Sequence, residues 1–249
     1  MTKIVLKCFI AIFIATSFIS ENLNAQNNMN FNQILTTKQQ RIIAIAALTA
    51  KGDLINLKPE LNSGLESGLS INQVKEVLVH LYAYCGFPRS IRGLQTFMEV
   101  LAERKSQGIN DVLGAEPSPI LEQRSKYDRG REILEKLLGT PQEESKTGYS
   151  AFAPEIDVFL KEHLFADIFE RDVLTYSERE LVTISVISTI GLAEPMLRAH
   201  LKICLNVGLA PEQLKQFVTI IKSTIGRKEA REARDILDEV LEIRLKETK

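Results

Sequence analysis

His200 and Glu180 form one candidate pair for proton transfer in this sequence. His200 lies on a predicted helix among apolar positions such as Leu197 and Leu201. Imidazole titrates near neutral pH, so His200 could act as a general acid or base. It could also be a core histidine bonded to a backbone carbonyl. Glu180 is the second candidate, but Ser177-x-x-Glu180 also fits a capping box, in which Glu180 would only complete a helix N-terminus.

His80 and Tyr84 form a second candidate pair. They are four positions apart and share one face of a predicted helix, so they could line a cleft together. Alternatively, they pack the interface between two parts of the chain. Tyr82 faces another side and is expected to be structural. Arg198 could bind a substrate carboxylate, although a solvated helix position is the simpler interpretation.

No metal, cofactor or nucleic-acid site is predicted. Lys and Arg number 31 against 32 acidic residues, and no stretch is strongly basic. His80, His163 and His200 lack a tight cluster of metal ligands around them. Cys85 and Cys204 do not form a CxxC and are expected to be buried apolar residues, with a disulfide between them as a minor alternative. A small-molecule substrate is the expected partner.

The N-terminus predicts export. Lys3 and Lys7 precede an uncharged apolar run over residues 8–19, and Ala25 offers a small residue for cleavage. This order is typical of a secretory signal peptide, here residues 1–25, and the run is short for a membrane-spanning helix. An uncleaved anchor is the alternative. The mature protein is therefore expected to be periplasmic or secreted, without a stable membrane anchor.

The chain repeats itself after 140 residues without a gap. Paired positions include Leu61 with Leu201 and Gly86 with Gly226. Apolar positions recur at helical spacing and no segment alternates with period two, so the fold is expected to be all-α. We expect a first unit at 26–110, a helical linker at 111–172 and a second unit at 173–249.

Helix boundaries can be predicted within these units. Capping boxes are expected at Ser177/Glu180, Ser70/Gln73 and Thr37/Gln40. Pro59 and Pro211 are expected to open helices. Further predicted helices span 71–85, 119–138, 154–169, 196–207 and 228–246. In the 154–169 helix, Ile156, Phe159, Leu160, Leu164 and Ile168 are expected to face inward.

Several phrases resemble the carboxymuconolactone decarboxylase family, which includes the alkylhydroperoxidase D-like proteins. They are FADIFER at 165–171, RELVTI at 179–184, LRAHL at 197–201, LNVG at 205–208 and VHLYAYCGFP at 79–88. The resemblance implies two helical units forming a pseudo-twofold pair, and a homo-oligomer that is a trimer of tandem chains. It also implies either cofactor-free decarboxylase chemistry or thiol-dependent peroxidase chemistry.

The sequence lacks the two cysteines that the thiol-dependent peroxidase chemistry requires. In the resembling peroxidases a CxxC precedes a histidine, and here Ala193 and Met196 occupy the two cysteine positions ahead of His200. Neither side chain can form a thiolate or a disulfide. The first unit has Asp53, Asn56 and Glu60 at the matching positions and lacks the whole motif.

The two units have lost complementary parts of the family pattern. The second keeps Glu180 and His200, whereas the first keeps His80 and Tyr84. We therefore hypothesise one composite pocket per chain, built from these four residues. The matching pocket, lined by Gln40, Glu60, Ile220 and Thr224, should be filled or too apolar for acid–base work.

Three function classes stay open. The first is a cofactor-free decarboxylase, lyase or isomerase acting on a small carboxylated or lactone-like molecule. The second is an alkylhydroperoxidase or peroxiredoxin-type antioxidant that uses Cys85 or Cys204. The third is a non-catalytic binding or assembly protein that retains the fold.

Overall fold

The computed structural model describes residues 34–142 and 147–247, and every regular element in them is a helix. The predicted signal peptide, residues 1–25, lies outside this part of the chain. None of the helices described is both long and apolar enough to cross a membrane.

Each unit contains four helices in the same order. The first unit has α2 (Thr37–Lys51), α3 (Leu54–Glu66), α4 (Ile71–His80) and α5 (Tyr82–Ser106). The second has α9 (Tyr176–Ile190), α10 (Glu194–Asn206), α11 (Pro211–Thr224) and α12 (Arg227–Glu247). The all-α fold and the tandem arrangement predicted from the sequence are confirmed.

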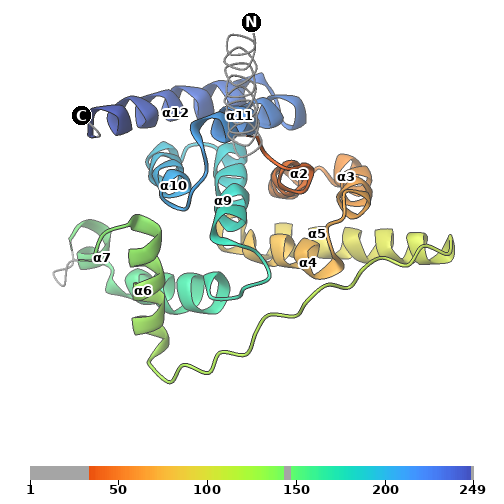
Figure 1. Ribbon diagram of the computed structural model, residues 1–249, viewed down its shortest axis with the longest axis horizontal. Coiled ribbons are helices and arrows are strands. Elements are labelled where there is room, and N and C mark those ends of the chain that lie inside the picture. The colour runs from red at the N-terminus through yellow and green to blue at the C-terminus, as the bar shows by residue number, and fades with distance from the viewer. Residues whose placement is uncertain (1–33, 143–146, 248–249) are drawn as a thin grey trace, which may run out of the picture.

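The two units pack against each other around a central pair of helices. Helices α2 and α9 pack against each other in the middle of the molecule (Figure 1). Both are buried nearly all round, with Ile42, Ile45, Val182 and Ile184 fully shielded from solvent. Helix α4 also packs on α9, and α11 packs on α2. Each unit therefore places its third helix against the first helix of the other, as in a pseudo-twofold pair.

Two of the three predicted capping boxes are formed by other residues in the structure. Ser70 and Gln73 cap α4 as predicted. The boxes at Thr37/Gln40 and Ser177/Glu180 are wrong, because the caps are Thr36 with Gln39 and Thr175 with Glu178. A capping hydroxyl must belong to an extended residue before the helix, and Thr175 is extended whereas Ser177 is already helical. Glu180 is thus not used by a cap.

Two other predicted helix boundaries also differ. Pro59 lies inside α3, which begins earlier at an Asp53 cap. The helix predicted over 71–85 is interrupted at Leu81, between α4 and α5, and Gly86 interrupts α5 with a φ of 80°. That conformation suits a residue without a Cβ. This break places Tyr84 on a short turn between the two interruptions.

The first part of the linker is extended and not helical, which corrects the helix predicted over 119–138. After α5 the chain runs as a strap to α6 (Lys126–Leu138), along the lower edge of the view in Figure 1. The carbonyls of Val112 and Leu113 accept the backbone N–H groups of Ile71 and Asn72, each at 2.9 Å. The strap therefore satisfies unpaired donors at the start of α4.

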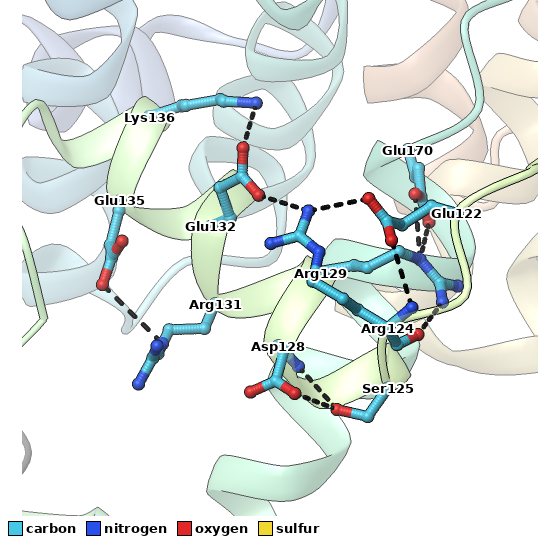
Figure 2. A network of polar contacts seen from close by, with 10 residues as sticks. All are labelled: Glu122, Arg124, Ser125, Asp128, Arg129, Arg131, Glu132, Glu135, Lys136 and Glu170. Atoms are coloured by element: carbon cyan, nitrogen blue, oxygen red, sulfur yellow. Dashed lines mark hydrogen bonds and ion pairs between the residues drawn. The ribbon is translucent and has the colours of Figure 1, made fainter.

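Ion pairs fasten the end of the strap to α6. Figure 2 shows Arg124 between Glu122 and Glu132, at 3.1 and 2.7 Å, and Arg129 paired with Glu170. Lys136 and Arg124 hold the pKa of Glu132 down to about 2. The network joins the strap, α6 and the segment that follows η1.

The rest of the linker contains α7 (Gly148–Phe152), α8 (Pro154–Phe159) and the π-helix η1 (Leu160–Phe169). Leu164 and Ile168 are buried as predicted, but Ile156 and Phe159 are 45% and 63% exposed. Ile156 and Phe159 belong to α8, whereas Leu164 and Ile168 belong to η1. The wider turn of the π-helix shifts the register between the two segments, so one α-helical spacing does not hold across both. Helix α6 crosses η1 so closely that a Cβ on Gly130 would lie 1.7 Å from the Lys161 carbonyl oxygen.

Candidate active site

Four predicted site residues form one cluster between the units. His80 ends α4, Tyr84 lies at the start of α5, Glu180 belongs to α9 and His200 to α10. The ring centroids of His80 and Tyr84 are 5.5 Å apart, and those of Tyr84 and His200 are 5.8 Å apart. His200 in turn bonds Glu180. Two elements of each unit thus contribute to a single group of side chains.

His200 and Glu180 form a carboxylate–histidine pair. The His200 Nδ1 lies 2.8 Å from the Glu180 Oε2. The Glu180 side chain is completely buried, whereas 14% of the His200 side chain is exposed. Because an ionised carboxylate only accepts hydrogen bonds, the imidazole donates from Nδ1. Its Nε2 is then left as the atom that can take up or release a proton.

Two buried oxygen atoms of the cluster make no hydrogen bond of ordinary length and angle within the described residues. They are the Tyr84 hydroxyl and the Glu180 Oε1. Burial and the nearby Glu180 raise the pKa of Tyr84, although the neighbouring Thr183 and Arg179 oppose this. The hydroxyl therefore stays protonated and can donate. Leaving such groups unpaired is costly in a core, so these two oxygen atoms are the ones of the cluster with unused hydrogen-bonding capacity.

His80 is the most enclosed member of the cluster. It is fully buried, with Nε2 at 2.9 Å from the Thr183 hydroxyl and Nδ1 at 3.2 Å from an Arg179 nitrogen. Burial, with Arg179 and His200 close by, lowers the pKa of His80 well below its usual value. His80 is therefore neutral at physiological pH, which separates its role from that of His200.

Sequence reasoning missed the residues that surround His80. Arg179 is fully buried and donates to Glu76 at 2.7 Å, and Arg171 bonds the same carboxylate. The Phe169 ring of η1 packs on His80 at 5.1 Å. Arg179 stands between Glu178 and Glu180 at a helix start, where charged residues are usually exposed, so the sequence carries no clear signal of its burial. In the sequence analysis, Arg179 belongs to the phrase at 179–184 that carries the family resemblance, and no separate role is assigned to it.

The structure does not bring Arg198 to this cluster. Arg198 pairs with Glu239 of α12. It lines a cleft of about 710 Å³ together with Lys202 and Arg244, and His200 is not among the residues of that cleft. His163 is likewise elsewhere, half-exposed and paired with Asp167.

The matching site of the pseudo-twofold has its polar groups occupied. The Gln40 amide donates to the Leu35 carbonyl at 2.9 Å. Glu60 accepts from Arg41 at 3.1 Å. Ile220, at the position that matches His80, packs against an apolar cluster. No histidine and no carboxylate–histidine pair occupies this place.

The two cysteines are unsuited to thiolate chemistry. Both are free thiols, and the Cys85 Sγ donates to the Leu81 carbonyl. Burial raises the pKa of Cys85 to about 11 and that of Cys204 well above its usual value. Within the described ranges, no group of three or more His, Cys, Asp or Glu side chains is arranged to hold a metal ion.

Fold and site together define a class: all-helical tandem-repeat proteins with a carboxylate–histidine pair buried between the repeats. The chain belongs to the carboxymuconolactone decarboxylase family, whose model matches residues 21–97 and 154–239. The gap between the two matches contains the strap, α6 and α7. The family resemblance seen in the sequence is thereby confirmed.

Two relatives illustrate the similarity. A 4-carboxymuconolactone decarboxylase of Acinetobacter baylyi is 27% identical over 116 residues, which covers 46% of this chain and 86% of the relative. An uncharacterized protein of Methanocaldococcus jannaschii, MJ1511, is 26% identical over 81 residues, covering 32% of this chain and 76% of the relative.

Proposed function

We propose that this protein is a cofactor-free acid–base enzyme of the decarboxylase, lyase or isomerase type. Its substrate would be a small carboxylated or lactone-like molecule. The observation that carries this proposal is the Glu180–His200 pair next to the Tyr84 ring, with the Tyr84 hydroxyl and the Glu180 Oε1 left without a hydrogen bond of ordinary length and angle. The similarity to a 4-carboxymuconolactone decarboxylase supports the substrate class.

For a decarboxylation, the steps follow from these side chains. The bond from carbon to the carboxylate breaks, carbon dioxide leaves, and the electron pair passes into a conjugated enolate. The Tyr84 hydroxyl donates to the oxygen on which negative charge develops. Protonated His200 returns a proton from Nε2 to carbon, and Glu180 stabilises the imidazolium before that transfer. His200 regains its proton from solvent.

Isomerisation would use the same groups in a different order. Neutral His200 would remove a proton from carbon next to a carbonyl, Tyr84 would stabilise the enolate, and His200 would return the proton to another carbon. Neither reaction needs Arg198, which lines the separate cleft described above. Thiol peroxidase chemistry is not favoured, because burial keeps Cys85 and Cys204 protonated.

The test is turnover of a panel of γ-lactone carboxylic acids that includes 4-carboxymuconolactone. Carbon dioxide release reports decarboxylation, and deuterium uptake from heavy water reports proton transfer to carbon. We expect Glu180→Gln to lose activity and His163→Gln, a matched change outside the cluster, to retain it. No turnover or exchange with any member would favour the non-catalytic alternative. Turnover that survives Glu180→Gln would contradict the proposed site.

We also propose that the mature protein is exported and forms a trimer of tandem chains. Large apolar side chains are exposed along the linker, including Val112 at 73%, Leu121 at 87% and Phe152 at 92%, and such a surface favours assembly. Light scattering and N-terminal mass spectrometry of protein from the native host would test the two statements. A monomer, or an intact Met1 in the membrane fraction, would contradict them.

A further inference from the structure

A buried network of hydrogen-bonded charged groups connects α4 to α9 and includes His80 of the candidate site. The Arg179 guanidinium donates to the Glu76 carboxylate at 2.7 Å and lies 3.2 Å from the His80 Nδ1. Glu76, His80 and Arg179 are all buried. Arg171, at the end of the linker, bonds the same carboxylate but not the histidine. Two arginines thus share one glutamate, and one of them contacts His80.

The donors and acceptors of this network determine which His80 nitrogen carries the ring proton. A guanidinium has only donors, so the His80 Nδ1 must accept. The ring proton is therefore on Nε2, which donates to the Thr183 hydroxyl at 2.9 Å. The Thr183 hydroxyl donates in turn to the Arg179 carbonyl at 3.0 Å. The loop thus begins and ends on Arg179, and the His80 Nε2 and Thr183 hydroxyl protons each have one acceptor.

We infer that Arg179 is a positioning residue that holds His80 as the neutral imidazole with its proton on Nε2. This inference rests on the proposed function, in which His200 carries the proton. A protonated His80 would put a second positive charge next to Tyr84 and His200. That charge would make the His200 imidazolium harder to form. Burial and Arg179 together keep His80 neutral, so that the proposed proton transfer falls to His200.

The charged and titratable groups around His80 come from every element packed against it. They are Glu76 on α4, Tyr84 on α5, Arg171 after η1, Arg179 and Glu180 on α9, and His200 on α10. From η1 itself, Phe169 contributes an uncharged ring against the imidazole. Of these charged groups, Arg179 is the one that bonds a His80 nitrogen, and it selects the tautomer together with the Thr183 hydroxyl on the opposite nitrogen.

Histidine side-chain ¹⁵N NMR tests the inference without any substrate. We expect His80, assigned with His80→Gln, to show an unprotonated Nδ1 and a protonated Nε2 from about pH 5 to about pH 9. A proton on Nδ1, or conversion to imidazolium within that range, would overturn the inference. If the tautomer is as expected but no substrate of the panel reacts, the arrangement of His80 stands and the proposed function fails.

A matched pair of arginine variants separates positioning from a purely structural role. Arg179→Met should lose the fixed tautomer, so that His80 titrates or exchanges between its two neutral forms. Arg171→Gln removes a bond to the same Glu76 and should leave the His80 signals unchanged. A His80 signature that persists in folded Arg179→Met would overturn the inference. If that variant does not fold, the spectrum of the parent protein still decides. In an active protein, Arg179→Met should also add a second ionisation to the pH–rate profile.

Discussion

The two pseudo-equivalent sites of this molecule have the same backbone frame but different contents. In one site His200 bonds Glu180, and the Tyr84 ring packs against both His200 and His80. In the other site, Ile220, Gln40 and Glu60 have separate partners. The linker packs on the first of these sites through Phe169. The comparison teaches that a duplicated helical frame can retain one polar site while its counterpart becomes part of the core.

A shift of one residue in helix capping accompanies this difference. In the first unit, Gln39 caps α2 from the third helical position. In the repeat its counterpart is Arg179, but the cap of α9 is Glu178, one residue earlier. Arg179 is thereby released from the helix end and turned into the interior, where it contacts His80. A small change at a helix start thus supplies a buried charge to one site only.

The largest expected effect on stability concerns Glu76 and its counterpart Gln216. Glu76→Gln leaves the buried Arg179 without its carboxylate and should lower the free energy of unfolding by about 3–5 kcal/mol. Gln216 accepts one backbone hydrogen bond from Leu35, so Gln216→Ala should cost only about 0.5–1.5 kcal/mol. Urea unfolding followed by circular dichroism measures both. Equal losses would show that the two sites do not differ in this way.

The hydroxyl of Tyr84 gives the next effect, on turnover. Tyr84→Phe removes the donor proposed for the enolate oxygen and should lower kcat by roughly 10²–10³-fold. Thr224 is at the matching position, and Thr224→Val should leave kcat unchanged. Steady-state kinetics with the best substrate of the lactone panel would measure this. Full activity in Tyr84→Phe would remove the tyrosine from the mechanism.

The linker contact at Gly130 comes third. A Cβ there meets the Lys161 carbonyl oxygen, a backbone atom that cannot move aside, so Gly130→Ala should cost about 1–3 kcal/mol or more. A Cβ on Gly226 meets only the end of the flexible Glu229 side chain, and Gly226→Ala should be mild. Thermal unfolding compares them. If Gly130→Ala is neutral, α6 and η1 do not pack as described.

The pH dependence of stability gives the smallest effect. His80 is neutral in the folded protein because its pKa is lowered, whereas in the unfolded chain it binds a proton below about pH 6.5. The unfolded state then holds more protons, so stability should fall as the pH decreases below that value. The contribution of His80 is at most about 1.4 kcal/mol per pH unit. His80→Gln should remove this part of the slope and His163→Gln should not. An unchanged slope in His80→Gln would mean that His80 is protonated in the folded state.

The tandem fold and the four residues of the cluster could be predicted from the sequence. The first follows from the internal repeat, and the second from polar residues within apolar helices. The all-α tandem fold followed from the spacing of residues such as Gly86 and Gly226. The pairing of Glu180 with His200 could not be read from the pattern, because the glutamate also fitted a capping box. Arg179 was missed for a related reason, since a charged residue near a helix start is usually exposed. The apolar spacing over 154–169 predicts a helix but does not distinguish an α-helical from a π-helical turn. The course of the strap depends on tertiary contacts such as that of its carbonyls with Asn72.

Turnover by His200→Gln and Glu60→Gln, compared side by side, tests the central claim most directly. These residues occupy matching positions in the two sites, and both variants would be assayed at equal concentrations of folded protein. The account predicts that His200→Gln loses roughly 10²–10⁴-fold in kcat, the usual contribution of a general acid–base group, while Glu60→Gln keeps the parent rate. Equal losses in both variants, or full activity in His200→Gln, would contradict it.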